Sequence, residues 1–305
     1  MTEKIGTKKI AVINDLSGFG RCSLTAAISV IAAMGAQPCP LPTAVLSAQT
    51  GYPSYYYDDY TEKMDCIRRE WEKMHVSFDG IYTGFMSGCS QIRKTIRFLD
   101  SFQDGSGFFL ADPIMGDNGE QFGFSTPEFQ EGMKELVRRA DIITPNLTEL
   151  CLLAGTDPGV MRELTGWGGN LPERTLVTGA AETLARSVMD RGPGEVLITG
   201  IRFLDDGTGE EMVGSLAVMK EGAFLSAQPY VGGSYSGTGD LFASVIAGGR
   251  ARGDSLRASA ELAGLFIARA VRDAAEAEVP RNEGVEYERH LKMLIPGESG
   301  VKTRE

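Results

Sequence analysis

The most constraining feature of this sequence is a regular alternation of short apolar runs with longer amphipathic segments, from residue 8 to residue 199. Short apolar runs bounded by turn residues predict buried strands, and apolar residues spaced three or four apart predict helices. Strands that alternate with helices form βαβ units, so we expect a parallel sheet with helices on both faces. The predicted strands are 8–15, 37–41, 80–83, 107–111, 141–144 and 195–199, and the predicted helices are 24–34, 62–75, 91–102, 128–139, 148–154 and 181–190.

The pattern changes toward the carboxyl end of the chain. An antiparallel hairpin is predicted there, followed by two helices. The pair 176–177 reads as a short strand or turn, and the polar tail 296–305 is expected to be frayed. The hairpin strands are 211–219 and 223–229 around a turn at 220–222, and the two helices are 240–250 and 255–275. We therefore expect residues 1–305 to form a single α/β domain, with the strand order left open.

Charge and composition exclude several classes of function. The chain has 30 Lys and Arg against 41 Asp and Glu, a net charge of −11, which argues against nucleic acid or an anionic membrane as the main partner. The longest apolar run, 28–36, is far shorter than the roughly 18 residues of a membrane span. The five scattered cysteines favour a reducing cytoplasm. Because no two of them have C-x-x-C spacing, neither a zinc site nor a dithiol motif is indicated. Two histidines make histidine-centred catalysis a weak expectation.

Polar residues follow the predicted strands at the edge where open parallel sheets bind ligands. Taken singly, each of them is as compatible with an ordinary helix cap or turn as with a site. The candidates are Asn14, Asp15, Thr83, Asp112, Thr144, Asn146 and Thr199.

A glycine-rich turn at 18–23 resembles a dinucleotide-binding fingerprint without matching it. Its pattern is G-x-G-x-x-S, so the third glycine is missing, and 38–50 contains no acidic residue to bind a ribose. A nicotinamide or flavin enzyme is therefore the weaker interpretation, and a tight structural turn is favoured. Ser23 is the expected N-cap of the helix that follows. The Walker pattern of P-loop NTPases does not occur in the sequence.

The most informative stretch is 232–243, where a run of Gly and Ser leads directly into an amphipathic helix. Small consecutive residues let backbone N–H groups converge, and a helix N-terminus adds unpaired donors and partial positive charge. Together they predict a phosphate site beside Asp240. We expect the helix end to lower the pKa of Asp240, which would leave it ionised and a weak base. The alternative is a flexible loop before an ordinary first-turn acid.

Three motifs in order resemble the ribokinase superfamily, most closely its pyridoxal/pyridoxamine kinase branch. They are Asp112-Pro113-Ile114-Met115-Gly116-Asp117, Thr144-Pro145-Asn146-Leu147-Thr148-Glu149 and Gly237-Thr238-Gly239-Asp240. The segment Ser47-Ala48-Gln49-Thr50-Gly51-Tyr52 is also similar to a vitamer-binding S-x-x-T-G-Y segment. The resemblance extends over about Lys8 to Val271.

The resemblance implies a ribokinase-like fold and an ATP-dependent kinase that phosphorylates the 5′-hydroxymethyl group of pyridoxal, pyridoxamine or pyridoxine. It implies Asp240 as general base and Gly237, Thr238 and Gly239 as anion hole. On the substrate side it points to Asp15, Ser47, Thr50, Tyr52 and Phe85. On the ATP and phosphate side it points to Asp112, Asp117, Asn146, Glu149 and Thr199. Mg²⁺ on Glu149 and Asp112, a monovalent cation and a homodimer are further expectations.

Two departures from the branch lie on the substrate side. The chain has Asp15-Leu16-Ser17 where pyridoxal kinases commonly have an S-H-V segment, and Phe85 where they often have Tyr. Hydroxymethylpyrimidine kinase, or another small-alcohol kinase of this fold, therefore stays open as an alternative. A vitamer- or nucleotide-binding protein without turnover is an alternative of another class, against which the presence of both Asp240 and Glu149 argues.

Several other features have less specific interpretations. The tyrosines of 52–57 either stack on a substrate ring, form a lid, or pack in a dimer contact. Arg21 either attracts phosphate or is simply solvated. For Asn146, the alternative to a phosphate site is a helix cap followed by an ordinary surface Glu149. The stripe Met64, Ile67, Trp71 and Met74 is expected to be core.

Overall fold

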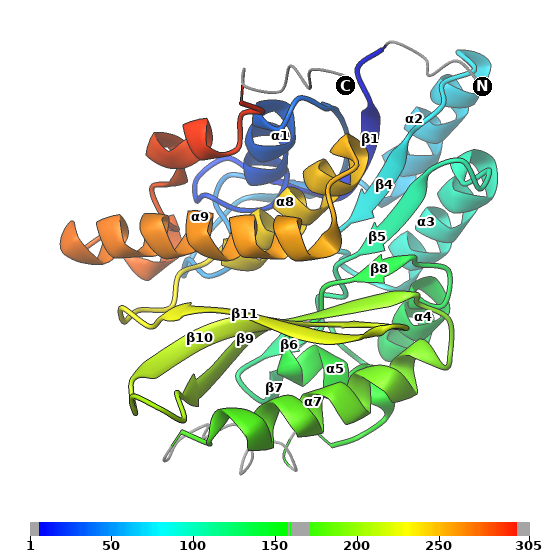
Figure 1. Cartoon of the computed structure of the whole chain (residues 1–305). Helices are drawn as coiled ribbons and strands as arrows, with labels where there is room; N and C mark the ends of the chain where they lie inside the picture. Colours follow the sequence, from blue (N-terminus) through cyan, green and yellow to red (C-terminus); the bar gives the residue numbers. More distant parts are fainter. Residues whose placement is uncertain (1–5, 158, 160–170, 298–305) are drawn as a thin grey trace, which may run out of the picture.

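A nine-stranded sheet runs through the molecule (Figure 1), in a computed structural model that describes residues 6–157, 159 and 171–297. The strand order is β11-β10-β9-β8-β5-β4-β1-β2-β3. Strands β2, β1, β4, β5, β8 and β9 pair in parallel, and β3, β10 and β11 add antiparallel partners at the two edges. The bounds are β1 Lys9–Ser17, β2 Gln37–Leu46, β3 Tyr57–Asp59, β4 Gly80–Thr83, β5 Phe108–Ala111, β8 Ile142–Ile143, β9 Glu195–Leu204, β10 Glu211–Met219 and β11 Gly222–Pro229. The expected α/β architecture with a C-terminal hairpin is confirmed.

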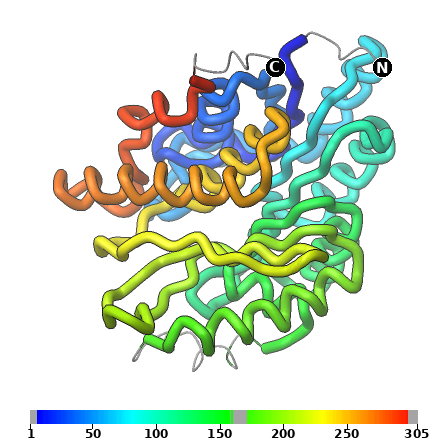
Figure 2. Tube along the Cα trace, viewed as in Figure 1, coloured from blue at the N-terminus to red at the C-terminus, as the bar shows by residue number. Residues whose placement is uncertain are grey.

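Helices cover both faces of the sheet because alternate strand residues point to opposite sides. In β1, Ile10 and Val12 pack under α1, α8 and α9, and Ala11 and Ile13 pack against the helices of the other face. The first group is α1 Ser23–Ala33, α8 Thr238–Arg252 and α9 Leu256–Glu276; the second is α2 Thr61–Lys73, α3 Cys89–Phe102, α4 Pro127–Val137, α5 Leu147–Ala154 and α7 Arg174–Met189. Figure 2 shows the orange α9 along the yellow β11, so the C-terminal helices close over the edge of the sheet.

Short elements at the edges complete the chain. A small hairpin of β6 Gly116–Asp117 and β7 Glu120–Gln121 follows β5. Two 3-10 helices follow α9, namely η1 Arg281–Glu283 and η2 Tyr287–Met293. Most of the tail expected to be frayed, 298–305, lies outside the described residues.

Several local expectations need correction. The pair 176–177 is part of α7, because Val177, Ala181, Ala185 and Val188 form one buried helical face. Strand β9 extends to Leu204 because β10 pairs with it, and strand β3 was not expected.

Ser23 is not the N-cap of α1: Cys22 is, and Ser23 is the first helical residue with φ of 51°. In the predicted apolar stripe of α2, Met64 is buried and Ile67 and Trp71 pack against the core, but Met74 is 67% exposed because the helix ends at Lys73.

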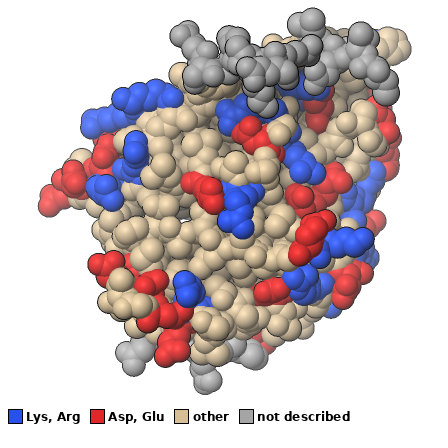
Figure 3. All heavy atoms as spheres, viewed as in Figure 1, with Lys and Arg blue, Asp and Glu red and all other residues tan. Residues whose placement is uncertain are grey.

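The surface carries charges of both signs. On the face shown in Figure 3, Lys and Arg are interspersed with Asp and Glu. In the described part of the chain, no helix is both long and apolar enough to cross a bilayer.

Candidate active site

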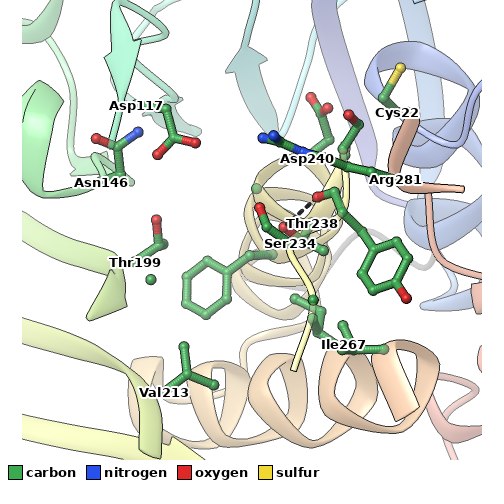
Figure 4. A pocket seen from close by; sticks show the side chains of 18 of the residues that line it. Cys22, Asp117, Asn146, Thr199, Val213, Ser234, Thr238, Asp240, Ile267 and Arg281 are labelled. Atoms are coloured by element: carbon green, nitrogen blue, oxygen red, sulfur yellow. Dashed lines mark hydrogen bonds between the residues drawn. The ribbon is translucent and has the colours of Figure 1, made fainter. Parts of the chain in front are cut away.

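A cavity of about 1120 Å³ lies at the carboxyl ends of the parallel strands. Strands β1, β9, β10 and β11 line it together with the residues that follow β4, β5 and β8. The start of α8, one face of α9 and residues 280–282 close its other side (Figure 4). Segments far apart in the sequence therefore meet at the edge where this class of sheet binds ligands.

The glycine-rich loop before α8 forms one wall of this cavity. Gly237 is the N-cap of α8 with φ of 84°, and a Cβ added there would overlap the Arg21 carbonyl oxygen. The first helical hydrogen bond is donated by the Leu241 N–H to the Gly237 oxygen. The N–H groups of Thr238, Gly239 and Asp240 consequently have no acceptor within the helix, and all three residues line the cavity. This arrangement suits an anion.

Asp240 lies in the first turn of α8, beside those donors. Burial raises its pKa to about 6, and the nearby Asp15 carboxylate adds to the rise. Hydrogen bonds from the Ser23 backbone N–H and the Asn14 amide lower the pKa of Asp240 in part. The expectation of a lowered pKa was therefore wrong, because desolvation outweighs the helix end. A carboxylate that titrates near pH 6 is a stronger base than an ordinary surface Asp.

Asn14, in the C-terminal half of β1, orients two parts of the site. Its Nδ2 donates to Asp240 Oδ1 at 3.1 Å, and its Oδ1 accepts from the N–H groups of Phe85 at 2.8 Å and Asp15 at 3.0 Å. A Cβ added at Gly84 would overlap the Asn14 amide. The glycine after β4 therefore leaves room for the residue that holds Asp240.

Ser23 has a left-handed backbone that is uncommon for a residue other than glycine. This conformation places a buried side chain beside Asp15 and a backbone N–H beside Asp240. Strained residues of this kind gather at functional sites.

Asp112, directly after β5, and Glu149, in the first turn of α5, form a second acidic group. Asp112 Oδ1 accepts from the Thr144 hydroxyl at 3.0 Å. Glu149 Oε1 accepts from the Met115 N–H at 3.2 Å, and its Oε2 accepts from the Asn146 N–H at 2.8 Å. Burial raises the pKa of Asp112 to about 8, with a contribution from Asp240, and burial together with Asp112 raises the pKa of Glu149 well above its usual value. Within the part of the chain that the structure describes, no ion pair includes either carboxylate, and two buried carboxylates of this kind attract a cation.

Asn146 caps α5 in a reciprocal pair with Glu149. The Glu149 N–H donates to Asn146 Oδ1 at 3.0 Å, which completes a capping box. Asn146 Nδ2 also donates to the Gly116 oxygen at 2.8 Å, and the residue bridges to Thr199 of β9. Asn146 is therefore a helix cap that also lines the cavity, and Glu149, only 5% exposed, is not a surface residue.

The donor set at Asp112 and Glu149 fits Mg²⁺ bound with a nucleotide. Within the described ranges, no group of three or more His, Cys, Asp or Glu side chains could hold a metal. Mg²⁺ prefers one or two carboxylates, with waters and substrate phosphates completing its octahedron. Two buried carboxylates in a cavity whose wall also suits an anion meet that description.

The predicted substrate-side residues divide into two groups. Asp15, Thr50, Tyr52 and Phe85 line the cavity. Asp15 is buried, accepts from the Ser17 hydroxyl at 2.7 Å and has a pKa raised by burial. Ser47 does not line the cavity. Its hydroxyl accepts from the Tyr56 N–H at 2.8 Å and joins the two ends of the segment 47–56.

Of the tyrosine cluster, only the first member faces the cavity. The ring of Tyr52 packs on Phe19 with centroids 5.6 Å apart. Tyr55, Tyr56 and Tyr57 are exposed, the last as the first residue of the edge strand β3. Arg21, which was considered for phosphate binding, pairs instead with Glu288 at 2.8 Å.

The opposite end of the cavity contains an apolar slot. Val213 of β10 and Ile267 of α9 line it below Thr199, as Figure 4 shows. The remaining predicted phosphate-side residue, Asp117, lies with Asn146 on the wall formed by the chain after β5 and β8. The acidic centre is thus flanked by an apolar slot on one side and by Asp15 and Phe85 on the other.

Many of the residues that line the cavity were not identified from the sequence, among them Gln49, Arg281 and Asn282 from two distant segments. Gln49 Nε2 donates to the Asn282 oxygen at 3.1 Å, and Asn282 Nδ2 donates to the Gly51 oxygen at 2.7 Å. The polar run 280–283 directly after the last long helix was the available signal. It was too general to place the segment at the site.

Comparison with a family model gives a match over most of the chain. The model described as phosphomethylpyrimidine kinase matches residues 17–284. Among curated proteins, pyridoxal kinase PdxY of Rubrobacter xylanophilus is 29% identical over 251 residues, which cover 80% of this chain and 79% of that protein.

Solved structures give the same picture. A Bacteroides thetaiotaomicron protein assigned as a phosphomethylpyrimidine kinase and crystallised with pyridoxal is 35% identical, with a TM-score of 0.84 over 96% of this chain and 98% of that one. The pyridoxal kinase of Lactobacillus plantarum, at 23% identity and a TM-score of 0.80 over 95% of this chain and 97% of that one, shares the fold.

Proposed function

This chain belongs to the phosphomethylpyrimidine kinase family, and from that premise we propose that it transfers the γ-phosphoryl group of ATP to the 5′-hydroxymethyl group of a vitamin B6 vitamer. One observation carries the proposal: the Asp240 carboxylate lies beside the open N–H groups at the start of α8, inside the cavity. The relative crystallised with pyridoxal supports the choice of acceptor. Curated pyridoxal kinases among the relatives support it as well.

Asp240 acts as the general base. Its carboxylate, held by Asn14, takes the proton of the acceptor hydroxyl as the oxygen attacks the γ-phosphorus. The bond between that phosphorus and the β–γ bridging oxygen breaks, and its electron pair leaves with ADP. The hydroxyl becomes acidic only as the new bond forms, so a base with a pKa of about 6 suffices.

The N–H groups of Thr238, Gly239 and Asp240 act as the anion hole. They are fixed before the reaction, because Gly237 is wedged against the Arg21 carbonyl. Preorganised donors stabilise the charge that develops on the phosphoryl oxygens without reorganisation at the moment of transfer.

The other groups of the cavity position the two substrates. The apolar slot at Val213 and Ile267 accepts the adenine, and Thr199, Asn146 and Asp117 face the phosphate chain. Asp112 and Glu149 would hold Mg²⁺, which would neutralise charge on the phosphate oxygens. Asp15 and Phe85 face the vitamer ring from the other end of the cavity.

A substrate panel tests the proposal. Pyridoxal, pyridoxamine, pyridoxine and hydroxymethylpyrimidine are each incubated with equal MgATP, and the phosphorylated product and ADP are quantified by chromatography and mass spectrometry. The proposal predicts a phosphorylated B6 vitamer and one ADP for each product. Turnover of hydroxymethylpyrimidine alone would contradict the acceptor, and calorimetric binding of a vitamer without ADP would contradict the kinase.

We further propose that the enzyme works in the cytoplasm as a homodimer. All five cysteines are free thiols, as in a reducing compartment. The exposed Tyr55 and Tyr56 beside the edge strand β3 offer a surface for a second copy. Sedimentation velocity with Tyr56→Ser as the variant tests the dimer, and a wild-type monomer across micromolar concentrations contradicts it.

A further inference from the structure

The cavity has an excess of negative charge that its own side chains do not balance. Of the described residues that line it, five are acidic and two are basic, and MgATP adds further negative charge. The acids are Asp15, Asp112, Asp117, Glu149 and Asp240, and the bases are Arg202 and Arg281. A phosphoryl donor in such a site needs cationic groups in addition to Mg²⁺.

Arg202 is already engaged by neighbouring strands. Its guanidinium pairs with Glu211 of β10 and lies over the Tyr230 ring, with 4.3 Å between the guanidinium carbon and the ring centroid. It therefore belongs to the outer end of the hairpin.

Arg281 is free of such partners. Among the ion pairs of the described residues none includes it, and its side chain is exposed to the cavity. Burial raises the pKa of Asp117, and the positive charge of Arg281 partly offsets this rise. The two side chains thus act on each other across open space without touching.

The backbone that carries Arg281 is fixed to the reacting end of the site. The Arg281 carbonyl accepts from the Ser236 N–H at 3.1 Å, one residue before the anion-hole loop. The Arg21 N–H donates to the Glu283 oxygen at 3.1 Å, and Asn282 is bonded to Gly51. η1 is therefore held by three separate segments of the site, which keeps the origin of the side chain in place.

The side from which the Arg281 side chain enters the cavity decides which phosphate group of a bound nucleotide it can reach. Figure 4 shows it entering from the side of Cys22, opposite the wall formed by Thr199 and Val213. A nucleotide whose base occupies the slot at Val213 presents its terminal phosphate toward the acceptor side. The α- and β-phosphates then lie farther from the guanidinium than the γ-phosphate.

We propose that Arg281 is a catalytic residue that binds the γ-phosphoryl group of ATP and stabilises it during transfer. The assignment rests on the kinase function proposed above. Its guanidinium donates N–H groups to the non-bridging γ-oxygens, opposite the backbone donors of α8, and stays with the phosphoryl group as it moves to the acceptor oxygen. A planar, permanently charged fork matches phosphate oxygens better than an ammonium does.

The test compares Arg281→Ala and Arg281→Lys with Arg289→Ala. Arg289 is a matched control, since it lies on the neighbouring η2, has a 67% exposed side chain and pairs with Glu286 outside the cavity. We expect Arg281→Ala to lower kcat by about 10²- to 10³-fold with the vitamer KM unchanged. Arg281→Lys recovers part of the rate, and free guanidinium at a concentration that leaves the melting temperature unchanged rescues Arg281→Ala. Arg289→Ala behaves as wild type.

A binding measurement separates this proposal from the choice of acceptor. Calorimetric titration with the Mg²⁺ complexes of AMPPNP and ADP, without any vitamer, should show about a tenfold loss of AMPPNP affinity in Arg281→Ala and no change for ADP. An equal loss for both nucleotides, or a kcat within twofold of wild type, overturns the proposal. A wild-type enzyme that phosphorylates no B6 vitamer overturns the proposed function instead. The comparison of AMPPNP and ADP affinities still decides the role of Arg281.

Discussion

The Asn14 amide nitrogen lies 3.1 Å from Asp240 Oδ1 and joins strand β1 to the start of α8, 226 residues later in the chain. The same amide holds the Phe85 N–H through its oxygen. One fully buried side chain therefore orients the carboxylate that takes the proton and the backbone that faces the acceptor. The active site depends on this cross-link as much as on the loop that contains Asp240.

Asn14→Ala removes the amide that favours the ionised form of Asp240. We expect the acid limb of the pH–rate profile to move to higher pH and the rate at pH 6 to fall about tenfold, the effect of one lost hydrogen bond to a charged group. Thr43→Val is the control, because the Thr43 hydroxyl donates to the Phe85 oxygen at 2.9 Å in an equally buried position outside the cavity. An acid limb that stays in place in Asn14→Ala contradicts the orienting role.

The pKa of Asp240, raised to about 6 by burial and Asp15, predicts the pH dependence of the wild-type enzyme. Below that pH the carboxyl is protonated and accepts no proton, so kcat/KM should rise with pH through an apparent pKa of about 6. Initial rates from pH 5 to 8.5 at constant ionic strength measure this. Pyridoxal and pyridoxine ionise differently, so a limb common to both belongs to the enzyme, and a flat profile down to pH 5 argues against the assignment.

Gly237→Ala tests the fixed geometry of the anion hole. An added Cβ meets the Arg21 carbonyl oxygen, which is backbone and cannot turn aside. We expect kcat to fall by about 10²-fold as the N–H groups of α8 shift. Gly232→Ala is the matched control, since its φ of 85° is similar but its Cβ meets nothing within 4 Å. Gly232→Ala should lower the free energy of unfolding by only about 1–2 kcal/mol, the cost of a left-handed backbone at alanine. Equal losses of activity in both variants would contradict the role of the close contact at Gly237.

Asp112→Asn should stabilise the metal-free protein at alkaline pH. Burial and Asp240 raise the pKa of Asp112 from 3.8 to about 8, so the folded state binds this proton more tightly than the unfolded chain does. In the wild-type protein, the proton on Asp112 stabilises the folded state fully below about pH 4, and this contribution is lost as the pH rises through about 8. The asparagine still accepts from Thr144 and has no charge to bury.

Thermal unfolding in EDTA at pH 5 and pH 8 checks this. The melting temperature of Asp112→Asn should exceed that of wild type at pH 8, and the difference should shrink at pH 5 and on adding MgATP. Asp100→Asn, which alters a surface acid with a 60% exposed side chain, serves as the control. A lower melting temperature of Asp112→Asn at pH 8 would show that its charge is compensated in the metal-free protein.

Local chemistry at the site was predictable from sequence where the residues are consecutive. The run 237–240 specifies a glycine cap and a first-turn acid, and 146–149 specifies a capping box, because both depend on neighbours within four positions. The sign of the pKa shift of Asp240 was not predictable. It depends on burial and on Asp15, which reaches the site only through the pairing of β1 with the rest of the sheet.

Arg281 shows the same limit more clearly. Nothing within four residues of it indicates a phosphate, and its position follows from hydrogen bonds to Ser236, Arg21 and Gly51 in three other segments. The same holds for α7, whose start at Arg174 depends on Val177 packing into the core.

The account's central claim is that Asp240 takes the proton of the acceptor, and Asp240→Asn tests it most directly. The measurement is the rate of phosphorylated pyridoxal formation with saturating MgATP, together with the calorimetric affinities for pyridoxal and the Mg²⁺ complex of AMPPNP. We expect a rate lower by about 10²- to 10⁴-fold with both affinities little changed. An Asp240→Asn enzyme that phosphorylates pyridoxal at the wild-type rate would contradict it.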